Sequence, residues 1–595
     1  MARNKFDIDE TLEKDSEFKF AHLKRLLGYA APYKTDMIKT VAIMLITSVL
    51  SLAAPYLLKI AIDESIPNKD IPGVIGLSAI LLACLFLSAV FVRQRIYTMS
   101  RVGQSIIRDL RLDLFKHMQE LPFAYYDSRP HGKILVRVVN YVNSLSDMLT
   151  NGLINLVTDM FSLVAIAGIM LILDIKLTLV SMAGLPLLLL VTWIIKNKQR
   201  VAWRLQSAKQ SNMNAYIHES LSGMKITQGF VREDFNMNIL TDVCHSVRES
   251  WIKAVAIMFF MWPAAENISV WTSSLLYAYG AYLVANDPLI TLGTVVAFGG
   301  YVWRFWVPIN NIANIYNTIV VNMSYMERIF ETIDEPVLIK DAENAAIMPH
   351  IKGNVNFDNV TFCYDTGIAV LKNVSFSIKA GETIALVGPT GAGKTTIINL
   401  ISRFYEAGEG TVSVDGVDVK SVTLKSLRTQ MGVMLQDSFV FAGTIMDNIR
   451  YGKLDATDEE VIAAAKAVCA HDFIMSCEDG YQTEVNERGS RLSLGERQLI
   501  SFARALLADP KILILDEATS SIDTKPELLV QEGLNHLLAG RTSFIIAHRL
   551  STIKNATRIM YIDDGIITEE GTHEELLAKE GAYYELYRAQ YAFLG

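Results

Sequence analysis

The sequence predicts an all-α transmembrane domain of six helices followed by an α/β domain. Apolar stretches long enough to cross a bilayer recur before residue 320. From Ile351 onward, short apolar strands alternate with helix-forming segments, which is typical of α/β domains. At 595 residues the chain is too long for one core. Hydrophobic residues make up 51% and charged residues 20%, so the chain is more hydrophobic than most soluble proteins.

The six spans are predicted from runs of apolar residues. Asp159 and Arg304 interrupt the third and the sixth run. The spans are placed near 37–60, 73–95, 150–173, 177–196, 254–284 and 291–318.

Two long polar connections favour helices that continue outside the membrane, over 96–149 and 197–253. These connections are rich in Lys and Arg, whereas the opposite loops are short and carry few cations. The positive-inside rule therefore places both termini and the long helices in the cytoplasm. Because the N-terminus is rich in acidic residues and resembles no transit peptide, we expect a bacterial plasma membrane.

The chain is expected to fall into four consecutive segments. Neither half is repeated, so a second nucleotide site would have to come from a second chain. The segments are an N-terminal tail and elbow helix (1–36), a transmembrane domain (37–326), a linker (327–350) and the α/β domain (351–595).

A complete phosphate-loop motif, G-x-x-x-x-G-K-[ST], lies in the α/β domain. It follows a predicted strand over 384–387 and opens a helix at Thr396, which is the context that the motif requires. Its glycines let backbone N–H groups surround phosphates, Lys394 would reach the β- and γ-phosphates, and Thr395 would bind Mg²⁺. The expected nucleotide-binding residues are Gly388, Pro389, Thr390, Gly391, Ala392, Gly393, Lys394, Thr395 and Thr396. This motif predicts a P-loop ATPase domain.

A second strand, over 512–515, ends in two adjacent carboxylates. A buried parallel strand would deliver both to the carboxyl edge of its sheet. Asp516 would orient Mg²⁺, and Glu517 would polarise the attacking water. His548 follows another strand, from which it could reach a γ-phosphate.

With these motifs in place, the chain resembles an ATP-binding cassette (ABC) exporter half-transporter over nearly its whole length. The resemblance implies an ATP hydrolase coupled to transport, with ATP and Mg²⁺ as cofactors. It further implies that Tyr364 stacks on adenine, that Gln436 senses Mg²⁺ and that His548 is the switch histidine. Asp523 ends a segment similar to the D-loop, and Ser493 and Gly495 match the signature loop that clamps an opposite subunit's ATP.

Two further segments resemble the pieces that couple the two halves of such exporters. Tyr126-Asp127, followed by Gly132, resembles the first coupling segment. The stretch from Gly223 to Glu233 resembles the second.

The signature loop departs from the family's Leu-Ser-Gly-Gly-Gln at two positions. Leu494 adds bulk where backbone must approach phosphate, and Glu496 adds negative charge, so a weaker clamp is expected. The pattern resembles one half of a heterodimeric exporter with one degenerate ATP site. A homodimer with a tolerated variant stays open, because a retained helix start still favours phosphate.

The cargo is the least determined feature of the sequence. Glu266 stands at membrane depth near Trp262, and is either functional, water-facing or paired with Arg304. Neighbouring aromatic side chains suit a lipophilic and cationic drug-like compound, although lipid-facing anchoring is their commoner use. A lipid flippase, a peptide exporter and an ATP-gated regulator share this architecture. The net charge of −8, with no basic stripe, argues against a nucleic-acid partner.

Overall fold

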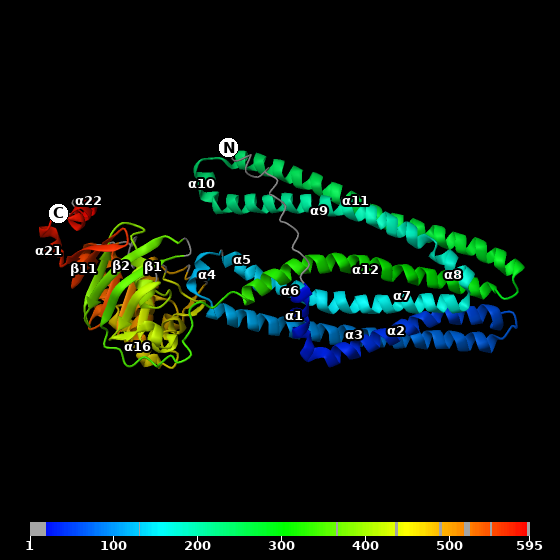
Figure 1. Cartoon of the computed structure of the whole chain (residues 1–595), viewed down its shortest axis with the longest axis horizontal. Coiled ribbons are helices and arrows are strands. Elements are labelled where there is room, and N and C mark those ends of the chain that lie inside the picture. The colour runs from blue at the N-terminus through cyan, green and yellow to red at the C-terminus, as the bar shows by residue number, and fades with distance from the viewer. Residues whose placement is uncertain are drawn as a thin grey trace. The chain divides into compact units, whose positions relative to one another are not determined.

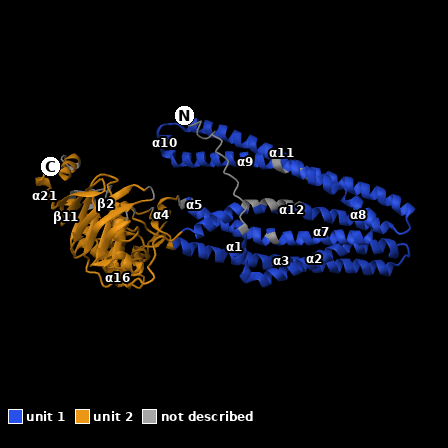
Figure 2. Ribbon diagram, viewed as in Figure 1, with its two compact units in different colours: residues 1–119, 130–335 blue, residues 120–129, 336–595 orange. Residues whose placement is uncertain are grey.

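A computed structural model describes residues 20–129, 131–364, 367–434, 438–486, 489, 491–516, 524–547 and 550–591. The chain divides into two compact units (Figure 2). Unit 1 comprises residues 1–119 and 130–335, and unit 2 comprises residues 120–129 and 336–595. The short piece 120–129 therefore belongs structurally with the C-terminal half.

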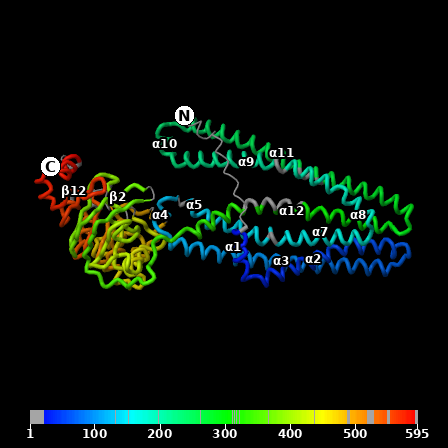
Figure 3. Tube along the Cα trace, viewed as in Figure 1, coloured from blue at the N-terminus to red at the C-terminus, as the bar shows by residue number. Residues whose placement is uncertain are grey.

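The described part of unit 1 is helical. Its principal helices are α1 (Phe20–Ala30), α2 (Lys34–Ile60), α3 (Ile71–Glu120), α5 (His131–Val136), α6 (Val142–Asp147), α7 (Ile154–Leu173), α8 (Ile175–Met182), α9 (Gly184–Ser222), α10 (Met224–Gly229), α11 (Glu233–Asn286) and α12 (Leu292–Ile333). The shorter turns are η2 (Ala31–Tyr33), η3 (Ala61–Ser65), η4 (Arg137–Tyr141) and η5 (Met148–Leu153). Figures 1 and 3 show α9 running beside α11, with α10 joining them at one end.

Within the described residues, four helical stretches are long and apolar enough to cross a membrane. They cover 21–65, 71–120, 134–173 and 175–222 and contain the first four predicted spans. The last two predicted spans fall within α11 and α12. The polar connections are helical as expected, since α3 continues to Glu120 and α9 to Ser222.

Helix α12 packs against α2, α7 and α11. Its buried side chains include Phe298, Tyr301 and Trp306, and the Tyr301 hydroxyl donates to the Leu52 carbonyl oxygen at 3.0 Å. At the start of α12, Asp63 accepts hydrogen bonds from the Thr291 hydroxyl at 2.5 Å and from the Gly293 N–H at 2.8 Å. These bonds tie the end of the first span to the beginning of the last.

The predicted linker begins too early, because α12 continues through Ile333. Ile329 and Phe330 are fully buried, so the helix has an apolar face to pack. The Arg25 guanidinium lies 4.4 Å from the Phe330 ring centroid and donates to Asp334 at 2.5 and 2.9 Å. Tertiary contacts therefore stabilise a helical end that looks merely polar in the sequence.

The described part of unit 2 begins with helix α4 (Phe123–Asp127) and then contains strands and short helices. Its strands are β1 (Val355–Cys363), β2 (Ala369–Ile378), β3 (Thr383–Val387), β4 (Glu409–Val414), β5 (Val417–Asp418), β6 (Met431–Met434), β7 (Gly443–Thr444), β8 (Glu484–Val485), β9 (Ile512–Asp516), β10 (Thr542–Ile546), β11 (Arg558–Asp563) and β12 (Ile566–Gly571).

The helices of unit 2 after α4 are α13 (Lys394–Ile401), α14 (Leu424–Arg428), α15 (Ile445–Arg450), α16 (Asp458–Ala467), α17 (His471–Ser476), α18 (Leu494–Leu507), α19 (Thr524–Leu538), α20 (Leu550–Lys554), α21 (His573–Ala578) and α22 (Ala582–Tyr591). Two short turns, η6 (Val419–Ser421) and η7 (Gly480–Gln482), complete it.

The main sheet has the strand order β12-β11-β3-β10-β9-β6 and is parallel except for the antiparallel edge strand β12. An antiparallel sheet, β2-β1-β4-β5, lies in the same unit, and β7 pairs with β8. The strands predicted near 355–362, 383–387, 411–414, 432–435, 512–515 and 543–547 correspond to β1, β3, β4, β6, β9 and β10. The sequence did not predict β2, β11 and β12 or the two-residue strands β5, β7 and β8. In β12, exposed and half-buried residues alternate, so its sequence lacks a continuous apolar run.

Candidate nucleotide site

The phosphate-loop motif forms the connection between β3 and α13. Gly388, Gly391 and Gly393 have φ angles of +147°, +86° and +107°, which L side chains rarely adopt. At Gly388, a Cβ atom would lie 2.0 Å from the Ile562 carbonyl oxygen in β11, so neighbouring backbone also requires glycine there. The loop turns sharply into the N-terminus of α13, where backbone N–H groups and the helix dipole favour an anion.

Lys394 is the first residue of α13 and folds back over the loop. Its Nζ donates to the carbonyl oxygens of Gly388 and Pro389 at 2.8 Å each, and the residue is 8% exposed. The ammonium group is therefore held over the turn that would cradle a phosphate. The next residue, Thr395, is exposed, as a hydroxyl that is to bind Mg²⁺ must be.

Tyr364 lies beside this helix start. Its hydroxyl is 3.1 Å from the Thr396 hydroxyl, and its ring packs edge-on against Phe362 and Tyr405, with centroids 4.8 and 5.1 Å apart. The side chain is half-buried, so part of it stays accessible. These contacts hold Tyr364, which the sequence predicts to stack on adenine, next to the phosphate loop.

Asp516 is the last residue of β9. The parallel pairing aligns Ile546 of β10 with both Asp516 and Leu386, so the carboxylate stands level with the end of β3, where the phosphate loop begins. The residue is half-buried. The sheet thereby brings a carboxylate and the phosphate loop to one edge, as the sequence predicted.

Four predicted site residues lie outside the described residues: Gln436, Glu517, Asp523 and His548. Their roles stay predictions.

The signature segment caps the 14-residue helix α18. The Ser493 hydroxyl accepts from the Glu496 N–H at 3.3 Å, and the Glu496 carboxylate accepts from the Ser493 N–H at 2.7 Å. This reciprocal arrangement is a capping box, which gives Glu496 a local structural role. Burial raises the pKa of the nearby Cys477 thiol, and the negative charge of Glu496 raises it further.

The carboxylate of Glu496 thus lies at the helix start where the sequence analysis expected phosphate to bind. Gly495 is buried and Leu494 half-buried, while Ser493 is exposed. The Ser493 N–H is already engaged by the chain's own carboxylate. A weaker clamp at this helix start stays a prediction.

The membrane candidates are not brought together in the part of the chain that the structure describes. Glu266 on α11 and Arg304 on α12 are both half-buried, and no ion pair joins them. Arg304 Nη1 instead donates to the Gly300 carbonyl oxygen of its own helix at 3.5 Å. The side chain of Trp262 lies outside the described residues.

Sequence reasoning missed Tyr405. Its hydroxyl donates to Asp127 of α4 at 3.0 Å, and the neighbouring Phe404 ring lies 4.4 Å from that of Phe123. The segment resembling the first coupling segment therefore packs within unit 2, against residues just after α13. The only available signal was the aromatic pair that follows the helix of the phosphate-loop motif.

Comparison with known proteins identifies the family to which this chain belongs. Residues 37–303 match the family model of the ABC transporter transmembrane region, and residues 371–520 match the family model described as ABC transporter. A helical membrane domain followed by a nucleotide-binding domain is the ABC exporter fold. The chain belongs to the ABC transporter family, in which ATP hydrolysis is coupled to transport.

Individual relatives share this architecture over almost their whole length. An uncharacterised ABC transporter ATP-binding protein of Bacillus subtilis, YknV, is 44% identical over 99% of this chain and 97% of its own. YgaD, a putative multidrug export protein of the same organism, is 37% identical over 96% and 99%. The solved structure of a bacterial Atm1-family ABC exporter with ATP bound has a TM-score of 0.79 at 29% identity, covering 94% of this chain and 99% of that one.

Other relatives carry different cargo names. A fatty acid ABC transporter of Mycobacterium tuberculosis is 37% identical over 86% of this chain and 80% of its own. A lipid A-core flippase of Desulfotalea psychrophila is 36% identical over 96% and 99%. The chain is thus a multi-pass protein of the bacterial plasma membrane and one half of a dimeric exporter, and family membership leaves its cargo class unassigned.

Proposed function

We propose that this half-transporter exports lipophilic compounds, including cationic ones, by ATP-driven alternating access. The observation that carries the ATP-driven part is the phosphate loop, with Lys394 held over the turn at 2.8 Å from two loop carbonyl oxygens. The long apolar helices and aromatic-rich last spans support a lipophilic cargo. Both termini are proposed to be cytoplasmic, on the side where the cationic connections lie.

The proposed ATP site uses the chain's own residues in distinct roles. Tyr364 would stack on adenine, and Lys394 would neutralise charge on the β- and γ-phosphates. Thr395, Gln436 and Asp516 would hold Mg²⁺ directly or through water. Glu517 would orient the attacking water, and His548 would contact the γ-phosphate.

The partner is proposed to be a different half-transporter. The capping box at Ser493 and Glu496 supports this, because it leaves a carboxylate where this chain would clamp the partner's ATP. The competent site would then combine this chain's Walker residues with the partner's signature loop. A homodimer is the alternative, since a carboxylate that swings away would restore the helix start.

The first experiment compares the ATPase rates of the purified full chain and Glu517→Gln, each in lipid with and without a co-expressed candidate partner. A loss of two or more orders of magnitude in the variant is the expected result, because the base that orients water is removed (roughly 10²–10⁴-fold). Retained steady hydrolysis would show that Glu517 has no such role. Full activity of the chain alone would establish the homodimer.

The second experiment tests the cargo in inside-out vesicles. ATP-dependent uptake of a lipophilic dye, absent with Glu517→Gln, is the expected outcome. Movement of a fluorescent phospholipid or fatty acid but of no dye would favour the lipid class for which two of the relatives are named. ATP turnover without movement of any cargo would favour a non-pumping regulator.

A further inference from the structure

Asp159 on α7 is a carboxylate at membrane depth that is poorly satisfied. Its Oδ1 accepts a single long hydrogen bond, 3.5 Å from Asn311 Nδ2 on α12. Its Oδ2 is buried and has no hydrogen-bond partner among the described residues. No ion pair with Lys or Arg involves Asp159 in the described ranges. This arrangement leaves the negative charge uncompensated within the described part of the chain.

Neighbouring polar groups on the same helix are satisfied, which sets Asp159 apart. The Ser162 hydroxyl is 2.7 Å from that of Ser48 on α2. The Thr158 hydroxyl donates to the Ile154 carbonyl oxygen at 3.2 Å and contacts the Met44 sulfur at 3.3 Å. These residues serve the packing of α7 on α2, whereas Asp159 faces α12 through Asn311.

The depth of Asp159 follows from helix geometry. At 1.5 Å per residue it lies about 21 Å along the axis from Leu173, the end of α7 opposite the long polar helices. A hydrocarbon core is about 30 Å thick, so Asp159 falls within it, in the half nearer the polar helices. A lone ionised carboxylate at such depth is costly unless it is neutralised or meets a cation.

A polar cavity lies close along the same face of α7. Asn155, one turn before Asp159, lines a cavity of about 170 Å³. Arg95 and Gln104 of α3 and Asp147 of α6 line it as well. With one cation and one anion in its lining, the cavity could admit a charged group without favouring either sign. A charged head group would therefore find polar side chains in this cavity, one helical turn from the Asp159 carboxylate.

We infer that Asp159, with Asn311, is the recognition site for the positive charge of a cationic amphiphile. The carboxylate supplies the counter-charge, the Asn311 amide orients it, and the apolar part of the cargo stays among the spans. This assignment rests on the proposed export function and names the substrate class more narrowly. It also moves the cation site from Glu266, the residue favoured by the sequence.

The test combines binding and transport, with tetraphenylphosphonium as the cationic probe and a neutral lipophilic dye as comparison. The complete dimer in nanodiscs is titrated with labelled probe without ATP, and uptake into proteoliposomes is then measured with ATP. Asp159→Asn should weaken tetraphenylphosphonium binding by about tenfold or more and leave neutral-dye uptake and basal ATPase unchanged, because only the counter-charge is lost. Asp159→Glu should restore binding, and Glu266→Gln serves as the matched control.

Three results for the Asp159→Asn variant would overturn the inference. They are undiminished cation binding by Asp159→Asn, equal loss of both cargoes, and dissociation of the dimer in that variant, which would mean that Asp159 pairs with the partner. Failure of the wild type to bind tetraphenylphosphonium would also overturn it. In contrast, binding that depends on Asp159 without ATP-driven uptake would sustain the cation site and contradict the export function.

Discussion

At the residue scale, Glu496 has a structural role at the start of α18 and a predicted effect on nucleotide binding. As the third residue of α18 it closes a capping box with Ser493, which stabilises a helix start by satisfying backbone N–H groups. The same negative charge would oppose a phosphate if this helix start clamps ATP, as the family resemblance implies. The departure from the family's signature motif at this position therefore has a structural reason. Its predicted effect on ATP affinity is electrostatic.

Glu496→Gln should separate the two effects, because a Gln amide oxygen can still accept from the Ser493 N–H. Removing the charge should lower the KM for ATP by roughly fivefold, since a charge at a helix start contributes about 1 kcal/mol. The measurement is steady-state ATPase of the dimer against ATP concentration.

A matched control for this variant is Glu575→Gln, which alters an equivalent capping box with Thr572 at the start of α21. An unchanged KM in Glu496→Gln would show that the carboxylate does not oppose phosphate. A KM change shared by the control would point to a general effect on folding.

Tyr364 offers a second residue-scale prediction. Tyr364→Phe keeps the ring and loses only the hydroxyl contact with Thr396, so ATP affinity should stay within about threefold of wild type. Tyr364→Ala removes the stacking surface and should weaken binding about tenfold, which corresponds to about 1.4 kcal/mol and lies within the range for an aromatic pair. Equilibrium titration with a fluorescent ATP analogue measures both, and equal effects of Phe and Ala would contradict a stacking role.

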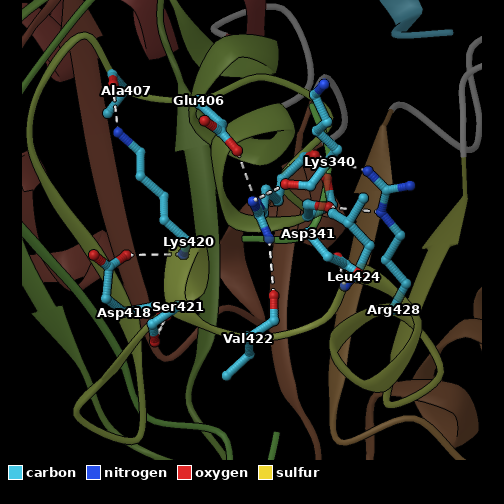
Figure 4. A network of polar contacts seen from close by, with 12 residues as sticks. Lys340, Asp341, Glu406, Ala407, Asp418, Lys420, Ser421, Val422, Leu424 and Arg428 are labelled. Carbon is cyan, nitrogen blue, oxygen red and sulfur yellow. Dashed lines mark hydrogen bonds and ion pairs between the residues drawn. The ribbon is translucent and has the colours of Figure 1, made fainter. Parts of the chain in front are cut away.

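At the element scale, a buried cation joins the segment entering unit 2 to the phosphate-loop helix. Arg403, 3% exposed, follows α13 and donates to Glu406 at 2.9 Å, to the Val422 carbonyl oxygen at 2.9 Å and to the Lys340 carbonyl oxygen at 3.0 Å. Figure 4 shows Lys340, Glu406 and Val422 around this point. The connection after α12 is thus anchored to the body of unit 2.

Arg403→Met should destabilise the C-terminal unit by about 3–5 kcal/mol, because it leaves Glu406 unpaired and two carbonyl oxygens without donors. The measurement is thermal unfolding of the full chain followed by a fluorophore in this unit. As a control, Asp564→Asn breaks the exposed ion pair with Lys372 and should change little, since exposed pairs contribute weakly. A fully stable Arg403→Met protein would contradict the anchoring role.

The carboxyl group of Asp415, between β4 and β5, should make the free energy of unfolding depend on pH. Burial opposes ionisation of Asp415, but hydrogen bonds from Asn354, Lys352 and Gly353 outweigh it and hold the pKa of this carboxyl below its usual range. A carboxyl whose folded pKa is depressed contributes stability above its unfolded pKa, near 4, and loses it as pH falls through the folded value.

Asp415→Asn should therefore unfold at a lower temperature than wild type at pH 7, and the two should converge below about pH 4. Asn tolerates the left-handed backbone of this position, where φ is +49°, so the variant keeps the backbone, removes the charge and replaces one accepting oxygen by an NH2 group that cannot accept. Melting curves of both proteins across that pH range provide the measurement. A gap that persists in acid would mean that geometry rather than charge is responsible.

At the scale of the whole molecule, a chain of contacts runs from α4 to the phosphate loop. Asp127 accepts from Tyr405, the Tyr405 ring packs edge-on against Tyr364, and Tyr364 bonds Thr396. Helix α4 follows α3, which continues from the second span. These contacts join α4 to the phosphate loop within unit 2, and the chain connects α4 directly to α3.

Tyr405→Phe should reduce transport per ATP hydrolysed several-fold while ATPase stays near wild type, because the ring is kept and the bond to Asp127 is lost. Vesicle uptake and ATPase measured on one preparation give this ratio. Tyr481→Phe, which removes the hydroxyl contact with His471, is the control. An unchanged ratio in Tyr405→Phe would show that this bond does not couple the two activities.

The sequence by itself determined the features that depend on local pattern. Runs of apolar residues marked the membrane helices, and the glycine and lysine spacing of residues 388–395 marked the phosphate loop, because both signals lie within one short segment. The edge strand β12 was not predicted because its apolar residues alternate only weakly with polar ones. The end of α12 was not predicted because Phe330 contacts Arg25, which is distant in the sequence.

Only the tertiary structure decided which distant side chains share a neighbourhood. Among the described residues it joined Glu266 and Arg304 by no ion pair, while it set Asp159 beside Asn311 and Tyr405 beside both Asp127 and Tyr364. It also showed that Glu496, which the sequence presents only as an added negative charge, caps the start of α18. Such pairings depend on helix rotation and strand register, which fix the direction of every side chain and which a linear pattern does not contain.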